Sequence, residues 1–126
     1  MNIPEGLKYT KDHEWVNLEG NTATIGITDY AQGELGDIVF IDIDPNLSEI
    51  AMGANCGTIE AVKTVSEIYA PCSGKVIEIN PALGTSPETV NQDPYGAGWM
   101  LKVEVSNPVE LDSLLNSGAY RELIGQ

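Results

Sequence analysis

The sequence is poor in positive charge. Its 126 residues include 6 lysines and arginines against 19 aspartates and glutamates, which gives a formal net charge of -13 at pH 7. A surface of this sign repels phosphate backbones and anionic membranes, so the composition argues against binding to nucleic acid or to a membrane. It favours docking onto basic patches of other proteins. Simple colloidal stability explains the same charge equally well.

Cysteine and histidine are also scarce. Cys56 and Cys72 form no CxxC motif and match no metal-ligand spacing. Both lie in or beside expected strands, where small buried apolar side chains are the favoured interpretation. His13 is the single histidine, so any nucleophile–base arrangement would depend on it alone. We therefore expect no catalytic residues, no metal site and no enzymatic activity of the chain by itself.

Long apolar runs and targeting patterns are absent. No stretch is apolar over the roughly 20 residues that a membrane-spanning helix needs. Residues 1–6 show neither a basic leader nor an apolar one. We expect a cytoplasmic protein, or a protein of the mitochondrial matrix if this is a mature eukaryotic form. The length corresponds to a single domain.

Short β-type segments separated by turn residues fill most of the chain. The apolar patterns predict strands over 13–18, 22–27, 37–43, 56–62, 65–69, 75–79 and 99–105. Thr28 is expected to cap a short helix over 29–32, which Gly33 or Gly36 would end. After Pro108 the leucines follow helical spacing, and Gly118 is expected to divide this tail into two short helices outside the β core.

One lysine, Lys63, stands between two of the expected strands. It would lie at or near the tip of a hairpin, where a modifying enzyme can reach its ammonium. The tip lacks an Asn-Gly or Asp-Gly pair, so the turn type stays open. From spacing alone, an ordinary solvated lysine is the simpler interpretation. A small acidic β domain with one presented lysine and no catalytic set nevertheless suits a swinging-arm carrier, whose cofactor visits the active sites of partner enzymes.

Matching blocks along nearly the whole chain resemble the H proteins of the glycine cleavage system. The blocks are residues 8–10, 13–15, 26–32, 35–40, 60–63, 69–74, 91–99 and 111–120. The resemblance implies a mainly β fold of the barrel-sandwich hybrid type, similar to lipoyl domains, with two short antiparallel sheets and flanking short helices. It implies one lipoyl-carrier domain over residues 1–126, with a β core over about 14–105 and a helical C-terminal tail over about 109–125.

The same resemblance implies a cofactor and partners. Lys63 would carry lipoate in amide linkage, attached by a lipoate-attaching enzyme. In the family, the P protein, a pyridoxal-phosphate-dependent glycine decarboxylase, transfers the aminomethyl group of glycine to the lipoyl arm. The T protein, an aminomethyltransferase, passes the one-carbon unit to tetrahydrofolate, and the L protein, dihydrolipoyl dehydrogenase, reoxidises the arm.

Three glutamates gain expected roles from the resemblance. Glu14 matches the glutamate of the family's His-Glu-Trp block, which lines the cleft that shelters the loaded arm. A carboxylate beside a protonated amine suits that cleft, although an ordinary exposed acid at a strand end would show the same sequence. Glu60 and Glu67 flank the lysine and are expected to be recognised by the lipoate-attaching enzyme and the partner proteins, unless they serve only solvation.

Departures from the family pattern leave alternatives open. Tyr30 replaces a common histidine, and Ala61 stands where serine is common. An H-like paralogue that relays lipoyl groups in lipoate metabolism would show such changes. An unmodified acidic protein-binding module is a further alternative. A biotin carrier fits less well, because Val62 and Thr64 flank the lysine where that class has methionines.

Overall fold

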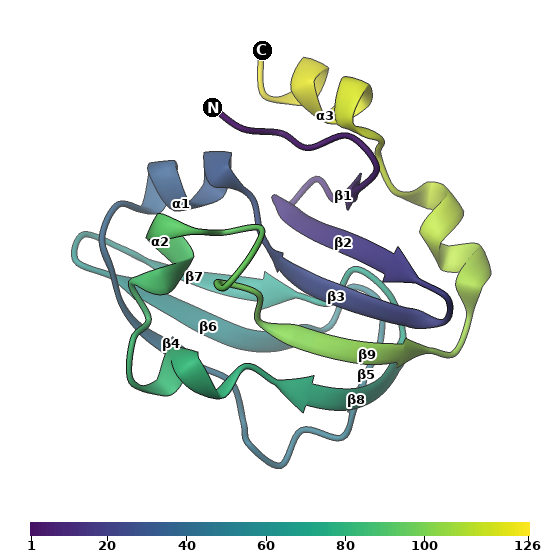
Figure 1. The fold of residues 1–126 in the computed structure, drawn as a ribbon, viewed down its shortest axis with the longest axis horizontal. Coiled ribbons are helices and arrows are strands. Elements are labelled where there is room, and N and C mark those ends of the chain that lie inside the picture. Colours follow the sequence, from purple (N-terminus) through teal and green to yellow (C-terminus); the bar gives the residue numbers. More distant parts are fainter.

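A computed structural model describes all residues, 1–126, as two antiparallel sheets with short helices around them (Figure 1). The larger sheet has the strand order β1 (Lys8–Tyr9), β2 (Glu14–Glu19), β3 (Thr22–Ile27), β9 (Leu101–Val105), β8 (Gly74–Ile79) and β5 (Glu49–Ile50). The smaller sheet has the order β4 (Ile38–Asp42), β6 (Asn55–Ala61) and β7 (Val65–Tyr69). The predicted mainly β fold class is confirmed.

The core lies between the two sheets and follows from strand alternation. Side chains at every second position of a strand face the same side. In β3 and β9 these positions hold Ala23, Ile25, Leu101 and Val103, all fully buried. Cys56 and Cys72 belong to the same apolar cluster and are unpaired, which confirms their prediction as small buried side chains.

Helix α1 (Asp29–Leu35) begins where the sequence predicted. The Ala31 N–H donates to Thr28 Oγ1 at 3.1 Å, a helix N-cap. The helix runs three residues beyond the expected 29–32, and Gly36 ends it with a left-handed φ of 79°. In Figure 1, α1 and the connection between β6 and β7 lie at the same end of the molecule.

The connection from β8 to β9 contains η1 (Pro81–Gly84) and α2 (Thr89–Gln92). Asn91 of α2 donates to the Gly36 carbonyl at 2.9 Å and accepts the Ile38 N–H at 2.9 Å. One side chain thus joins the end of α1 to the beginning of β4. This junction supports the segment against which the β6–β7 hairpin packs.

The C-terminal tail contains η2 (Pro108–Ser113) and α3 (Ser117–Leu123). The expectation that Gly118 divides the tail is wrong, since Gly118 lies in the first turn of α3. The division falls instead at residues 114–116, where Tyr9 and Leu115 exchange backbone hydrogen bonds of 2.8 Å. Pairing with β1 keeps these residues extended, and Asn116 then caps α3 through the Ala119 N–H.

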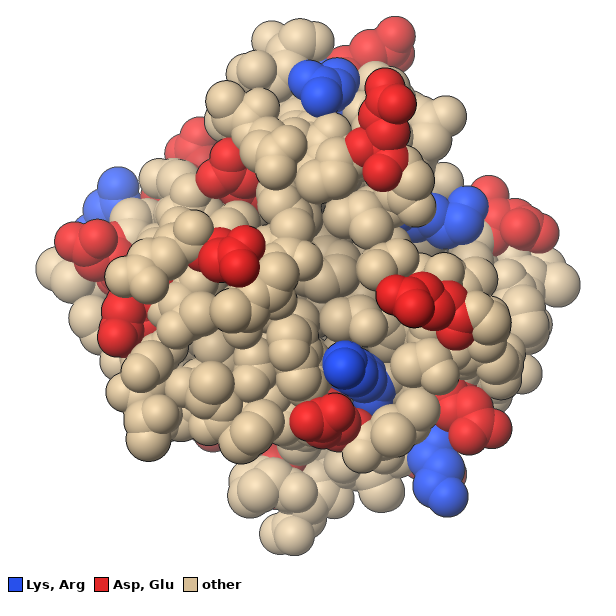
Figure 2. All heavy atoms as spheres, viewed as in Figure 1, with Lys and Arg blue, Asp and Glu red and all other residues tan.

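Acidic side chains are spread over the face seen in Figure 2, with few basic ones between them. One ion pair is present, between Lys102 Nζ and Glu78 Oε1 at 3.9 Å. Both side chains are well exposed, so the pair contributes at most about 1 kcal/mol. None of the helices combines the length and the apolar character needed to cross a bilayer.

Candidate functional site

Lys63 lies at the tip of the β6–β7 hairpin, as the strand pattern predicted. The register pairs Glu60 with Val65, and the Ala61 N–H donates to the Thr64 carbonyl at 2.8 Å. Val62 and Lys63 are therefore the two residues of the turn. Neither has a positive φ, which excludes the primed turn types that Asn-Gly sequences adopt. The lysine is exposed on a short, hydrogen-bonded turn.

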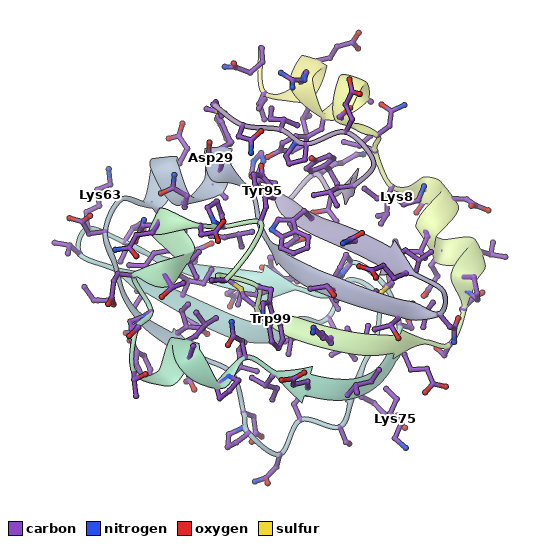
Figure 3. All side chains as sticks on the ribbon, in the orientation of Figure 1. Lys8, Asp29, Lys63, Lys75, Tyr95 and Trp99 are labelled. Atoms are coloured by element: carbon purple, nitrogen blue, oxygen red, sulfur yellow. The ribbon has the colours of Figure 1, made fainter.

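The hairpin tip is tied to the junction between α1 and β4. The Val62 N–H donates to the Asp37 carbonyl at 3.0 Å. A Cβ atom placed on Gly36 would lie 3.2 Å from Lys63 Cε, so the lysine stem passes directly over this glycine. Figure 3 shows Lys63 at the margin of the molecule beside α1, at the end opposite Lys8 and Lys75.

An apolar surface surrounds the lysine on the outer face of the smaller sheet. Val62 is 75% exposed, Val65 59% and Phe40 47%. The register sets Phe40, Glu60 and Val65 side by side on three adjacent strands. The exposure of Phe40 was not predictable from the sequence, because the run Ile-Val-Phe-Ile of β4 is apolar on both faces and is typical of a fully buried strand.

Glu60 and Glu67 are exposed on the two strands that lead to Lys63. Glu60 lies between Phe40 and Val65, and the Glu67 carboxylate accepts a hydrogen bond from the Tyr69 hydroxyl. Both carboxylates therefore lie on the exposed surface of the hairpin that presents Lys63.

Glu14 is buried at the beginning of β2, with 2% of its surface exposed. Its Oε1 accepts the Thr10 hydroxyl at 2.6 Å, and its Oε2 accepts the Tyr69 N–H at 3.2 Å. Desolvation raises the pKa of Glu14 to about 7, against the opposing effect of these two hydrogen bonds. The interpretation of Glu14 as an ordinary exposed acid is therefore wrong.

Two cavities share Glu14 as part of their walls. The first, here the α1 pocket, has a volume of about 260 Å³ and lies between α1, β2 and the β6–β7 hairpin. Its lining includes Ile27, Tyr30, Ala31, Leu35, Ile59 and Glu67. The second, here the tail pocket, has a volume of about 330 Å³. Its lining includes Tyr9, Met52, Tyr69, Pro71, Leu114 and Leu115.

His13 also lines the α1 pocket and has a left-handed φ of 68°. Its Nδ1 lies 2.9 Å from the Tyr120 hydroxyl of α3, and its ring centroid lies 4.9 Å from that of Tyr30. Desolvation lowers the pKa of His13, which favours the neutral imidazole at pH 7. No serine, threonine or cysteine hydrogen-bonds to this ring, and its contact with Tyr120 anchors α3 to the pocket wall.

The glycine cleavage H-protein family model matches residues 7–126. The glycine cleavage system H protein of Staphylococcus haemolyticus (strain JCSC1435) is 57% identical over 126 residues, and that of Staphylococcus carnosus (strain TM300) is 54% identical over 126 residues. Both alignments cover all of each chain. The crystal structure of a glycine cleavage system H protein from Mycobacterium marinum superposes with a TM-score of 0.89 at 37% identity, covering 98% of this chain and 100% of the other. The chain belongs to the glycine cleavage H-protein family.

Proposed function

We propose that the chain carries a lipoyl group on Lys63 and shuttles the aminomethyl group of glycine from the P protein to the T protein, with reoxidation by the L protein. Membership of the H-protein family makes the chain a carrier component of glycine cleavage. The finer steps are proposals. They rest chiefly on one observation, the exposed Lys63 on a two-residue turn that hydrogen bonds hold in place.

The surroundings of Lys63 fit a lipoyl group. The lysine is exposed, its stem lies over a glycine, and the tip is anchored through the Asp37 carbonyl. A modifying enzyme thus meets an ammonium that no neighbouring side chain covers. When bound, lipoate supplies the thiol chemistry of carriage, while this chain supplies the position of the attachment atom.

The α1 pocket is the proposed shelter for the loaded arm. Leu35 lines the pocket and stands next to Gly36, over which the Lys63 stem passes. An arm that folds back from Lys63 along α1 therefore reaches a cavity whose walls combine apolar side chains with carboxylates. Glu14 lies in the wall of that cavity, and its carboxylate has lone pairs beyond the two already used. A charge-assisted hydrogen bond from a protonated amine to this carboxylate would hold the cargo away from water.

Glu60 and Glu67 are the proposed recognition residues for the lipoate-attaching enzyme and the partner proteins. They combine negative charge with the exposed apolar side chains of Phe40 and Val65. An enzyme that brings Lys63 into its active site has to contact this surface. Basic groups at the mouth of that active site would complement the two carboxylates.

Intact mass measurement with peptide mapping tests the proposal. The protein is co-expressed with a lipoate ligase and supplied with lipoate. We expect one lipoyl-sized mass increase, located on Lys63, while the exposed Lys75 stays unmodified. An unmodified Lys63 would contradict the carrier role and favour the acidic protein-binding module.

Reconstitution then separates the two lipoylated alternatives. The lipoyl protein is mixed with P protein, pyridoxal phosphate, glycine and labelled bicarbonate, and exchange of label into glycine is measured. We expect exchange that depends on the amount of lipoyl protein. A fully lipoylated chain that supports no exchange would favour a paralogue that relays lipoyl groups.

A further inference from the structure

We propose that Thr10 is a positioning residue for Glu14, whose carboxylate its hydroxyl holds in the wall shared by the α1 pocket and the tail pocket. This inference rests on the proposed role of Glu14 in sheltering the loaded arm. The resemblance to the H-protein family assigned no function to Thr10.

The hydroxyl of Thr10 has all of its hydrogen-bonding capacity in use. Its oxygen accepts the N–H groups of Asp12 at 3.2 Å and of Glu14 at 3.1 Å. A hydroxyl has two lone pairs and one proton. Because both backbone groups can only donate, the remaining proton of Thr10 points to Glu14 Oε1 at 2.6 Å.

The backbone around Thr10 fixes the position of this hydroxyl. The Thr10 N–H donates to the Glu14 carbonyl at 3.0 Å, and the His13 N–H donates to the Thr10 carbonyl at 3.2 Å. His13 closes this turn with its left-handed φ. The donor to Oε1 therefore belongs to a rigid turn that precedes β2.

The second carboxylate oxygen has a donor from another element. The Tyr69 N–H of β7 reaches Oε2 at 3.2 Å. One donor from the 10–14 turn and one from the smaller sheet together fix the plane of the carboxylate. No lysine, arginine or histidine lies within ion-pair distance of Glu14. The two hydrogen-bond donors therefore stabilise the buried carboxylate, as a cation does in a buried ion pair.

The arrangement also favours the ionised carboxylate. Because both lone pairs of the Thr10 hydroxyl are occupied, a protonated Oε1 would find no acceptor there. Loss of the hydroxyl removes a donor that lowers the pKa of Glu14 and leaves desolvation less opposed. The titratable or charged groups that face Glu14 or line its two pockets are Tyr9, Lys11, Asp12, His13, Tyr30, Glu34, Cys56, Glu67, Tyr69 and Tyr120.

The test compares Thr10→Val, which keeps the shape and loses the hydroxyl, with Thr10→Ser, which keeps the hydroxyl. The carboxyl carbon of Glu14 is titrated by NMR in the unmodified proteins, with its signal assigned from Glu14→Gln. A hydrogen bond to a charged group is equivalent to about one to two pKa units. We expect a rise of that size in Thr10→Val and a wild-type titration in Thr10→Ser. A wild-type titration in Thr10→Val would overturn the inference, whatever the state of Lys63.

A second readout links the titration to the carrier role. The lipoyl forms are loaded by P protein with glycine, and the half-life of the bound amine is followed at pH 7. We expect a half-life about fivefold shorter in Thr10→Val, because a pKa one unit higher lowers the ionised fraction of Glu14 at pH 7 from about one half to about one tenth. Thr10→Ser should show a normal half-life. A normal half-life in Thr10→Val with a short one in Glu14→Gln would overturn the positioning role. A normal half-life in Glu14→Gln would remove the proposed role of Glu14 itself.

Thr10 also caps backbone groups, so Thr10→Val has a folding control. Circular dichroism and thermal unfolding show whether the variant retains the fold. If it does not, Thr10→Cys replaces it, because a thiol is a weaker donor than a hydroxyl. The Glu14 pKa in that variant should lie above its value in Thr10→Ser, and equal pKa values would contradict the proposal.

Discussion

The hydroxyl of Tyr120 lies 2.8 Å from Oγ1 of Thr28, so the last helix of the chain contacts the residue that caps α1. The same hydroxyl lies 2.9 Å from His13 Nδ1, and the Tyr120 ring stacks on Tyr9 with a centroid distance of 4.7 Å. Helix α3 is thereby joined to two elements that line the α1 pocket.

Tyr120→Phe should lower the free energy of unfolding by about 1–3 kcal/mol, because it leaves the fully buried Thr28 hydroxyl and His13 without their shared partner. Urea unfolding followed by circular dichroism measures the change. Tyr30→Phe also removes a tyrosine hydroxyl, but this hydroxyl makes no hydrogen bond. The substitution should therefore change the free energy of unfolding by less than about 0.5 kcal/mol. Equal effects of the two substitutions would contradict this account.

Lys63→Arg should abolish lipoylation and leave folding intact. The side chain is exposed at the hairpin tip and makes no ion pair, so its stability effect should stay within about 0.5 kcal/mol. Intact mass after co-expression with a ligase and urea unfolding give the two readouts. Lys75→Arg, on the larger sheet, should keep full lipoylation. A large loss of stability in Lys63→Arg would instead indicate a structural lysine.

Glu14 should make the free energy of unfolding depend on pH. Its pKa is about 7 in the folded protein, above the ordinary glutamate value of 4.5, so the folded state binds the proton more tightly than the unfolded chain. The contribution of Glu14 to stability is therefore fully present below pH 4.5 and is lost as the pH rises to 7. Because one pKa unit corresponds to about 1.4 kcal/mol, the loss is about 3 kcal/mol.

Urea unfolding of the wild type and of Glu14→Gln across this pH range measures that dependence. The stability of the wild type relative to the variant should decrease by about 3 kcal/mol as the pH rises. Burial lowers the pKa of His13, so protonation of this residue destabilises the folded protein as the pH falls. This effect is common to the wild type and the variant and cancels in the comparison. A difference between the two proteins that does not vary with pH would exclude a raised pKa of Glu14.

Glycine substitutions should separate close packing from free space. A Cβ on Gly74 would overlap the Glu104 carbonyl oxygen on the neighbouring strand β9, so Gly74→Ala should forbid the present pairing and cost several kcal/mol, on the order of 3. Gly33 lies inside α1 with open space around it. Gly33→Ala should stabilise by about 0.5–1 kcal/mol through helix propensity. Thermal unfolding of both variants measures this contrast. Equal shifts of the melting temperature in the two variants would contradict the prediction.

Neutralising the acids around the lysine should slow lipoate attachment. Glu60→Gln and Glu67→Gln are each expected to lower kcat/KM of the attaching enzyme about threefold to tenfold, mostly through KM, because a lost surface charge weakens docking by about 1 kcal/mol. Glu49→Gln on β5, in the larger sheet, also removes an exposed carboxylate and should change nothing. Rates that depend only on total charge would make the control behave like the two test variants.

Much of the fold was predictable because short-range patterns determine it. The strand over 22–27 has the expected bounds, since its alternation and its flanking turn residues are local features. The Lys63 hairpin was predictable for the same reason. Thr28 and Gly36 were identified as candidate helix ends because their chemistry suits those positions.

The environment of Glu14 was not predictable from local patterns. Its carboxylate accepts the Tyr69 N–H, which is 55 residues away in the sequence. Residues of α1 and of the C-terminal tail form the pocket walls around it. The tail itself was interpreted wrongly at Gly118, because the backbone pairing of Leu115 with Tyr9 outweighs local preference there. Resemblance to a family marked Glu14 as relevant, while only the three-dimensional contacts give a physical reason.

The single ion pair of this acidic chain has a consequence for its handling in solution. Since attraction between charges contributes little and the formal net charge is -13, the sum of electrostatic forces opposes the compact state. Added sodium chloride shields that repulsion and should raise the melting temperature. The same ions shield the attraction between the acidic hairpin surface and a basic partner. A buffer that stabilises the fold in this way should therefore slow the proposed encounter with partner enzymes.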